Sequence, residues 1–158
     1  MAQLWRLFEK APSAGLYGEL RELGGVQARN RCIAFVTASL GKNERLGWYA
    51  PADFLVEILT RETMFEAAWA VVRDHKVTAR VQKALALASE KQHPREAIAV
   101  YTGRVDELVA RGGDLNYAEA VTLLNRMAGL RSSGEQAAHV ATLKLHHARR
   151  RNLLKLLG

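Results

Sequence analysis

Apolar residues recur at every third or fourth position along most of the chain, which is the spacing of helices that bury one face. A sustained alternation of apolar and polar residues is absent, and so are the Asn-Gly and Asp-Gly dipeptides that form tight hairpins. The pattern therefore predicts an all-α protein in which short turns join about nine helices. Glycine pairs, prolines and a serine-rich segment mark the expected helix ends.

The expected helices follow one another closely. The first stops before Pro12, and the second is capped by Ser13 and ends at a glycine pair, residues 24 and 25. On that second helix, one face should bury Leu16, Tyr17, Leu20 and Leu23. Further helices are expected over residues 26–40, 78–89, 94–111 and 135–158. Two more lie between residues 51 and 72: one begins at Pro51 and carries Phe54, Leu55, Ile58 and Leu59, and the next carries Met64, Phe65, Ala68, Trp69 and Val72. Another is capped by Asn116 or Asp114 and carries the apolar positions from Tyr117 to Ala128. In the irregular segment between residues 41 and 51, Trp48 and Tyr49 are expected to fill a gap between helices.

Three of the predicted helices begin with the same short pattern, x-Glu-Ala-x-x. Its glutamates are Glu66, Glu96 and Glu119, which are 30 and 23 residues apart. The small alanine would let a neighbouring helix approach closely, and a glutamate in the first turn favours the helix dipole. The pattern favours stacked helix pairs over a simple bundle. Chance is the alternative explanation, because Glu-Ala is a common pair in helices.

Residues 94–101 (PREAIAVY) and 117–124 (YAEAVTLL) resemble the second helices of tetratricopeptide-type repeats. More specifically, residues 64–158 resemble the α-helical region found downstream of SWIM zinc fingers in some bacterial proteins. The resemblance rests on these two segments, on the Ala-rich helix at 79–88 and on the basic tail at 147–157, and it covers 95 of 158 residues. It implies an α-α superhelix of tetratricopeptide-like helix pairs.

The chain departs from that family in its metal ligands and its repeat length. The SWIM pattern of three cysteines and one histidine is absent, because Cys32 is the one cysteine. The spacings of 30 and 23 residues do not fit a tetratricopeptide period of about 34, and the Trp-Leu-Gly signature is missing. The resemblance thus implies a scaffold without a metal site. We expect one helical domain over 1–158, with less regular helices over 1–50 and helix-pair repeats over 51–158.

Recognisable catalytic motifs are missing from the sequence. It has no Gly-rich phosphate loop, nucleophile elbow, CxxC or HExxH. A single cysteine excludes an internal disulfide and an all-thiolate metal site, and Cys32 is expected to be a buried small residue. Glu135 and His139 share a helix face, but they supply only half of a metal site. We therefore expect no enzyme activity, no catalytic residue, no metal and no cofactor.

The first ten residues lack the basic leader and apolar run of a signal peptide. The longest uninterrupted apolar runs span a few residues, far short of a membrane span. These features predict a cytoplasmic protein, and a free thiol agrees with a reducing compartment.

Almost all of the net charge of +7 lies in the last fifth of the sequence. Residues 126–158 carry seven basic side chains and one acid, Glu135, whereas the first 125 residues have a net charge of +1. If the last helix is continuous, Lys144, Arg151 and Lys155 share one flank. That flank lies between an expected core stripe (Val140, Leu143, His147, Leu154 and Leu157) and a second apolar strip (Leu145 and Leu156). His147 is expected to be a hydrogen-bonded structural histidine.

Three interpretations of this basic helix are open. The cations could stabilise the C-terminal end of the helix, by about 0.3–1 kcal/mol each, while their stems cover the leucines. They could instead orient a protein partner that buries Leu145, Leu153 and Leu156. They could also contact nucleic-acid phosphates, although consecutive arginines on a helix diverge by about 100° and no aromatic residue is interleaved for base stacking.

From these observations we expect a non-catalytic helical-repeat scaffold that mediates protein–protein interaction. Its partner would be another protein, acidic in character, or a second copy of the chain, and no membrane. The alternative is a nucleic-acid-binding accessory protein that uses the same basic helix. The candidate partner-binding residues are Lys144, Leu145, Arg149, Arg150, Arg151, Lys155 and Leu156. The salt dependence of binding distinguishes the protein-binding interpretation from the nucleic-acid-binding one, because phosphate contacts weaken steeply with ionic strength.

Overall fold

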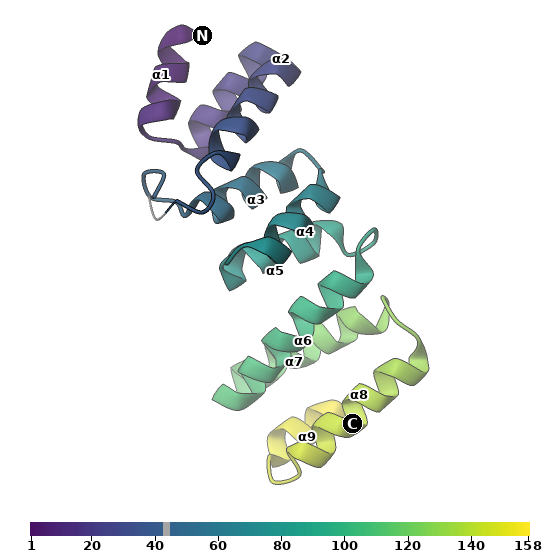
Figure 1. Ribbon diagram of the computed structural model, residues 1–158. Coiled ribbons are helices and arrows are strands. Elements are labelled where there is room, and N and C mark those ends of the chain that lie inside the picture. Colours follow the sequence, from purple (N-terminus) through teal and green to yellow (C-terminus); the bar gives the residue numbers. More distant parts are fainter. Residues whose placement is uncertain (43–44) are drawn as a thin grey trace. The chain divides into compact units, whose positions relative to one another are not determined.

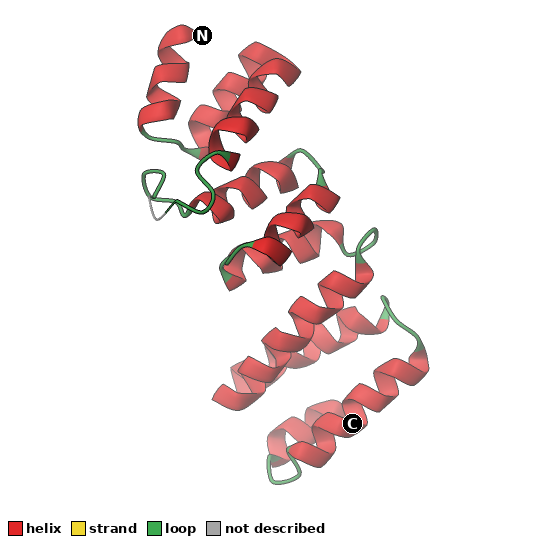
Figure 2. Ribbon diagram, in the orientation of Figure 1, coloured by secondary structure: helices red, strands yellow, loops and turns green. Residues whose placement is uncertain are grey.

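A computed structural model describes residues 1–42 and 45–158, and within them every regular element is a helix (Figures 1 and 2). The all-α fold class is therefore confirmed, with nine helices in this described part of the chain. The chain forms two compact units, Met1–Leu85 and Ala86–Gly158. Residues 1–50, which were expected to be less regular, hold two well-formed helices, and the first unit continues beyond them.

The first unit contains α1 (Ala2–Lys10), α2 (Ala14–Thr37), α3 (Pro51–Arg61), α4 (Phe65–Asp74) and the greater part of α5 (Ala79–Ser89). Helices that are neighbours in sequence pack together: α1 on α2, α2 on α3 and α3 on α4 (Figure 1). α3 is the most deeply buried, because seven of its eleven residues are buried. Asp53 is among them, and it accepts hydrogen bonds from the Thr78 backbone N–H at 2.9 Å and hydroxyl at 2.8 Å.

An aromatic cluster forms the core where α1, α2 and α3 meet. The ring of Phe8 lies 5.7 Å from that of Trp5, 5.9 Å from Phe35 and 6.1 Å from Phe54, between centroids. The rings are stacked or tilted, which are favourable arrangements for aromatic pairs. Cys32 is fully buried, as predicted, and burial raises the pKa of its thiol to about 11.

The irregular segment before α3 places its two aromatic residues differently. Leu46 and Tyr49 exchange backbone hydrogen bonds of 3.0 and 3.1 Å, which closes a tight turn. Tyr49 stacks on Phe54 with 4.8 Å between ring centroids, as expected for a gap-filling residue. Trp48 lies within the turn and is 93% exposed, so the prediction that it packs between helices is wrong. Residues 43 and 44 of this segment lie outside the described part.

The segment labelled α2 consists of two helical stretches that meet at a break, as the sequence predicted. Ser13 caps it as expected, since its side chain accepts a hydrogen bond from the Leu16 backbone N–H at 3.2 Å. Gly25 interrupts it with φ of 57° and ψ of −141°, a conformation that is open mainly to glycine. The position of the break was predicted correctly. Leu23, expected on the buried face, is 63% exposed.

The second unit contains the end of α5, then α6 (Pro94–Arg111), α7 (Asp114–Ala128), α8 (Ser133–His146) and α9 (Arg151–Leu157). α6 and α7 pack closely, and the small residues Ala97 and Ala120 are fully buried. Gly113 precedes α7, so neither predicted cap is used; Asn116 instead donates its side-chain amide to the Gly112 carbonyl at 2.6 Å. α9 packs on α7 and buries Leu153 completely.

The predicted continuous helix over 135–158 is wrong. The chain leaves the helical conformation after His146 and resumes it at Arg151. The helical wheel of a single helix therefore does not apply to the basic side chains. Leu153, which a partner was expected to bury, lies in the core of the unit. His147 lies in the turn, half-buried, and not on a helical core stripe.

Candidate interaction surface of the second unit

Arg126, at the start of the basic segment, belongs to a polar cluster within the second unit. Its Nε donates to Glu90 Oε2 at 2.7 Å, and the Tyr101 hydroxyl donates to the same oxygen at 2.6 Å. The hydrogen bonds from Arg126 and Tyr101 lower the pKa of Glu90, whereas burial and the Glu90 charge raise the pKa of Tyr101. Arg126 thus stabilises the unit and is not available to a partner.

Arg131 and the two residues considered as half of a metal site are also engaged. Arg131 donates from Nε to Gln136 Oε1 at 2.8 Å, and its Nη2 lies 2.8 Å from His139 Nδ1. Burial and the Arg131 charge lower the pKa of His139. Glu135 closes a capping box with Ser132, whose backbone N–H donates to it at 2.9 Å. The described residues contain no group of three side chains suited to hold a metal ion.

Two of the predicted partner-binding residues contact the chain itself. The Arg150 guanidinium donates to the Val109 carbonyl and, at 3.1 Å, to the Tyr117 hydroxyl. It therefore fastens the start of α9 to α6 and α7. The Lys144 ammonium lies against the Gly158 carbonyl oxygen. Arg150 thus has a structural role within the unit, and we leave it out of the surface described next.

The other five predicted residues lie along the end of α8, the turn after it and α9: Leu145 in the last turn of α8, Arg149 in the turn, Arg151 at the start of α9, and Lys155 and Leu156 in the last turn of α9. Arg149, Arg151 and Lys155 are exposed, and within the described residues they form no hydrogen bond or ion pair. Leu145 is 77% exposed and Leu156 is 48% exposed. We name these five residues the basic edge. Among the described residues, three free cations and two exposed leucines thus occur between residues 145 and 156, whereas the other four cations of the basic segment are engaged.

A hollow of about 390 Å³ opens beside the basic edge. It is lined by residues 145–150, which include the imidazoles of His146 and His147 and contain no carboxylate. The His147 backbone N–H donates to the Leu143 carbonyl at 3.0 Å, which holds the turn against the end of α8. The hollow can receive an anionic or hydrogen-bonding group of a partner that contacts the edge.

The first unit holds a second polar cluster that no sequence motif indicated. The Tyr17 hydroxyl donates to Glu62 Oε1 at 2.8 Å, Arg21 Nε donates to the same oxygen at 3.0 Å, and Arg29 lies 3.9 Å from Oε2. Burial alone would raise the pKa of Glu62, but the hydrogen bonds from Tyr17 and Arg21 lower it overall. Burial, together with Glu62, raises the pKa of Tyr17. A carboxylate held ionised and a phenol held protonated are a structural pair rather than an acid and base poised near neutral pH.

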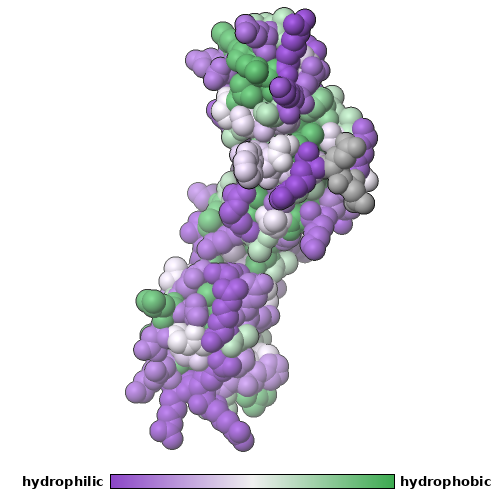
Figure 3. All heavy atoms as spheres, turned by 90° about the vertical axis from the view of Figure 1, so that its left-hand side faces the viewer, coloured by the Kyte–Doolittle hydropathy of each residue, from purple (hydrophilic) through white to green (hydrophobic). Residues whose placement is uncertain are grey.

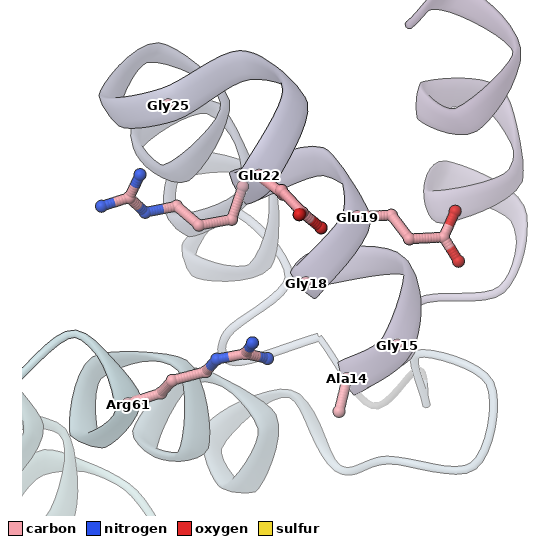
Figure 4. A pocket seen from close by; sticks show the side chains of 8 residues that line it. Ala14, Gly15, Gly18, Glu19, Glu22, Gly25 and Arg61 are labelled. Atoms are coloured by element: carbon pink, nitrogen blue, oxygen red, sulfur yellow. The ribbon is translucent and has the colours of Figure 1, made fainter.

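An open groove lies next to this cluster, between α2 and α3 (Figure 4). Arg61 reaches from the end of α3 toward Gly18 of α2, where a Cβ would lie 3.3 Å from its guanidinium. Glu19 and Glu22 border the groove from α2, and Figure 4 shows Glu19 pointing away from Arg61. The spacing of Glu19 and Glu22 could have indicated an exposed acidic surface on α2. Sequence analysis missed it because Leu23, which lies next to Glu22, was expected on the buried face of the helix.

Among the described helices, none is both long and apolar enough to cross a lipid bilayer. No family model matches the chain, and comparisons with curated proteins and with solved structures found no significant match. Function is therefore inferred from the surfaces described above.

Proposed function

We propose that this protein is a non-catalytic helical scaffold that binds another protein through the basic edge of its second unit. The observation that carries the proposal is the occurrence, between residues 145 and 156, of three cations that have no partner among the described residues and of two exposed leucines. Burying leucine contributes roughly 25 cal/mol per Å² of apolar surface. Arginine is enriched among the residues that dominate binding energy at protein interfaces.

The positions of the arginines argue against a purely stabilising role. A cation stabilises a helix when it lies near the C-terminal end, where the dipole is negative. Lys155 does lie in the last turn of α9, but Arg151 is the first residue of that helix and Arg149 precedes it. Arg151 therefore lies at the positive end of the α9 dipole, where a cation is not stabilised by that dipole, and Arg149 lies between the negative end of α8 and the positive end of α9.

A tetratricopeptide-like arrangement of helix pairs is part of the same proposal. It is supported by the packing of α3 on α4 in the first unit and of α6 on α7 in the second. The buried Ala97 and Ala120 allow close approach of α6 and α7, as small residues do in stacked helix pairs. Such scaffolds commonly present surfaces to other proteins, whereas catalysis would need a pocket with converging ionisable groups.

The test compares the full chain with a variant of the basic edge in which Leu145→Ser, Arg149→Ser, Arg151→Ser and Leu156→Ser are combined. A control variant combines Leu115→Ser, Lys91→Ser and Arg111→Ser, which alters exposed residues elsewhere in the same unit. The tagged proteins are used to capture partners from a cell extract with and without nuclease treatment, with mass spectrometry as the readout. We expect the wild type and the control to retain the same proteins, and the edge variant to retain them about tenfold less.

Two outcomes would contradict the proposal. Equal capture by the edge variant would show that this surface is not used. Capture that disappears with nuclease, together with an affinity for duplex DNA or RNA that falls steeply with salt, would instead support the nucleic-acid alternative. A protein contact in which leucines supply part of the binding energy should weaken much less steeply over the same range of salt.

A further inference from the structure

α2 carries an exposed surface with the opposite charge to the basic edge. Glu19, Glu22 and Leu23 lie at positions i, i+3 and i+4 before the kink, so they share one side of the helix, and Val26 follows the kink. Leu23 and Val26 are 63% and 53% exposed. Glu19 and Glu22 form no hydrogen bond or ion pair in the described part of the chain. We name these four residues the acidic face.

Two cations that line the same groove as Glu19 and Glu22 are engaged with other groups. Arg21 lies 3.0 Å from Glu62, and the Arg61 guanidinium lies 5.7 Å from the centre of the Tyr17 ring. Neither forms an ion pair with Glu19 or Glu22 among the described residues. The two carboxylates therefore remain available to cations from outside the unit.

A hollow of about 600 Å³ adjoins the acidic face on the side of α1. Trp5, Leu20, Leu23 and Ala28 contribute apolar lining. Gln27 and Arg31 contribute polar lining, and the Arg31 guanidinium is stacked 3.7 Å from the centre of the Trp5 ring. Figure 3 shows hydrophobic side chains gathered on the part of the first unit formed by α1 and α2. The acidic face thus offers two carboxylates together with a hollow that can receive an aliphatic side chain.

The acidic face and the basic edge complement each other group by group. Two unpaired carboxylates can meet two unpaired guanidinium groups, which bind carboxylates in a bidentate geometry. The leucines of the edge, Leu145 and Leu156, can contact Leu23 and Val26. Leu115 is the most exposed leucine of the second unit, at 89%, but it is a weaker candidate for contact with the acidic face. Its neighbour Asp114 is itself acidic and accepts a hydrogen bond from Asn152 at 3.0 Å.

We propose that the partner of the basic edge is a second copy of this chain, which binds through its acidic face. The inference rests on the function proposed above and specifies its partner. Because the two surfaces differ, the contact is heterologous: a copy that uses its edge still offers its acidic face to another copy. Such contacts build a closed ring or an open chain of copies, and not only a symmetric dimer.

The experiment measures the self-association of the purified full chain by sedimentation velocity over a range of concentrations. It uses the edge variant defined above and a face variant, Glu19→Lys with Glu22→Lys. A second face variant, Leu23→Ser with Val26→Ser, leaves the carboxylates in place, and circular dichroism checks the folding of each protein. We expect the wild type to associate, and each variant alone to associate at least about tenfold more weakly, because like charges or lost apolar contacts oppose the interface.

Mixing two defective variants gives the sharpest test. The face variant keeps an intact edge and the edge variant keeps an intact face, so an equimolar mixture should form a complex of one copy of each that grows no further. A mixture that stays monomeric would overturn the proposal. So would a wild type that is monomeric at every concentration, or a face variant that still associates like the wild type.

Failure of this inference can be told apart from failure of the proposed function. If the wild type is monomeric but the edge variant still loses its captured proteins, the edge binds a different protein and only the identity of the partner is wrong. If the edge variant neither loses captured proteins nor changes self-association, both proposals are wrong.

Discussion

Arg149 and Arg150 are adjacent in the sequence, yet their side chains do different things. The Arg150 guanidinium donates to the Val109 carbonyl and the Tyr117 hydroxyl, while Arg149 is exposed and without a partner in the described residues. Both arginines were predicted to bind a partner, since residue type and position give no basis for separating them. Only the path of the chain after α8 determines which one turns inward.

Replacement of these two arginines should therefore have opposite effects on stability and binding. Arg150→Ala should lower the free energy of unfolding of the second unit by about 1–3 kcal/mol, because two buried acceptors lose a charged donor. Arg149→Ala should change it by less than about 0.5 kcal/mol but weaken partner binding. Urea unfolding followed by circular dichroism measures the first effect, and capture of partners measures the second. Equal stability of the two variants would contradict the role assigned to Arg150.

At the scale of helices, local signals predicted some ends and missed others. α6 begins at Pro94 and is followed by Gly112, as expected from the preference of proline for the first turn and of glycine for the position after the last. The break between α8 and α9 has no such signal, because residues 143–154 contain neither glycine nor proline. It is accounted for by tertiary contacts, namely the burial of Leu153 against α7 and the hydrogen bonds of Arg150.

Two glycines within helices should respond in opposite ways to alanine. Gly25 has a φ of 57°, so Gly25→Ala should destabilise the first unit by about 1–2 kcal/mol through backbone strain. Gly103 lies in α6, and a Cβ added there would meet open space, so Gly103→Ala should stabilise the second unit by about 0.5–1 kcal/mol. Thermal unfolding of the two variants measures whether each substitution raises or lowers the stability of its unit. A stabilising Gly25→Ala would mean that the kink at this residue is not required.

At the scale of the whole molecule, each unit contains the same kind of polar cluster. A tyrosine hydroxyl and an arginine both donate to one carboxylate, Glu62 in the first unit and Glu90 in the second. In both clusters the carboxylate is far in sequence from at least one of its donors, which is why no local motif indicated them. All-helical architecture follows from local periodicity, whereas these clusters depend on contacts between distant segments.

The two carboxylates should make both units sensitive to acid. Their pKa values lie below the ordinary 4.5, so each stabilises the folded state at neutral pH and loses that effect as the pH falls below 4.5. Glu62→Gln and Glu90→Gln should therefore lower stability near pH 7 and flatten its decline between about pH 5 and 3. Urea titrations at several pH values test this, with the exposed Asp74→Asn as a control. An unchanged pH dependence in both glutamine variants would contradict the assignment.

The packing of α9 on α7 also sets an order of events during synthesis of the protein. The first unit closes within residues 1–85, so it can fold while the ribosome is still translating the rest. The second unit cannot complete its core until Leu153 has emerged, because α9 covers α7. Until then α7 exposes on the nascent chain the apolar surface that α9 later covers.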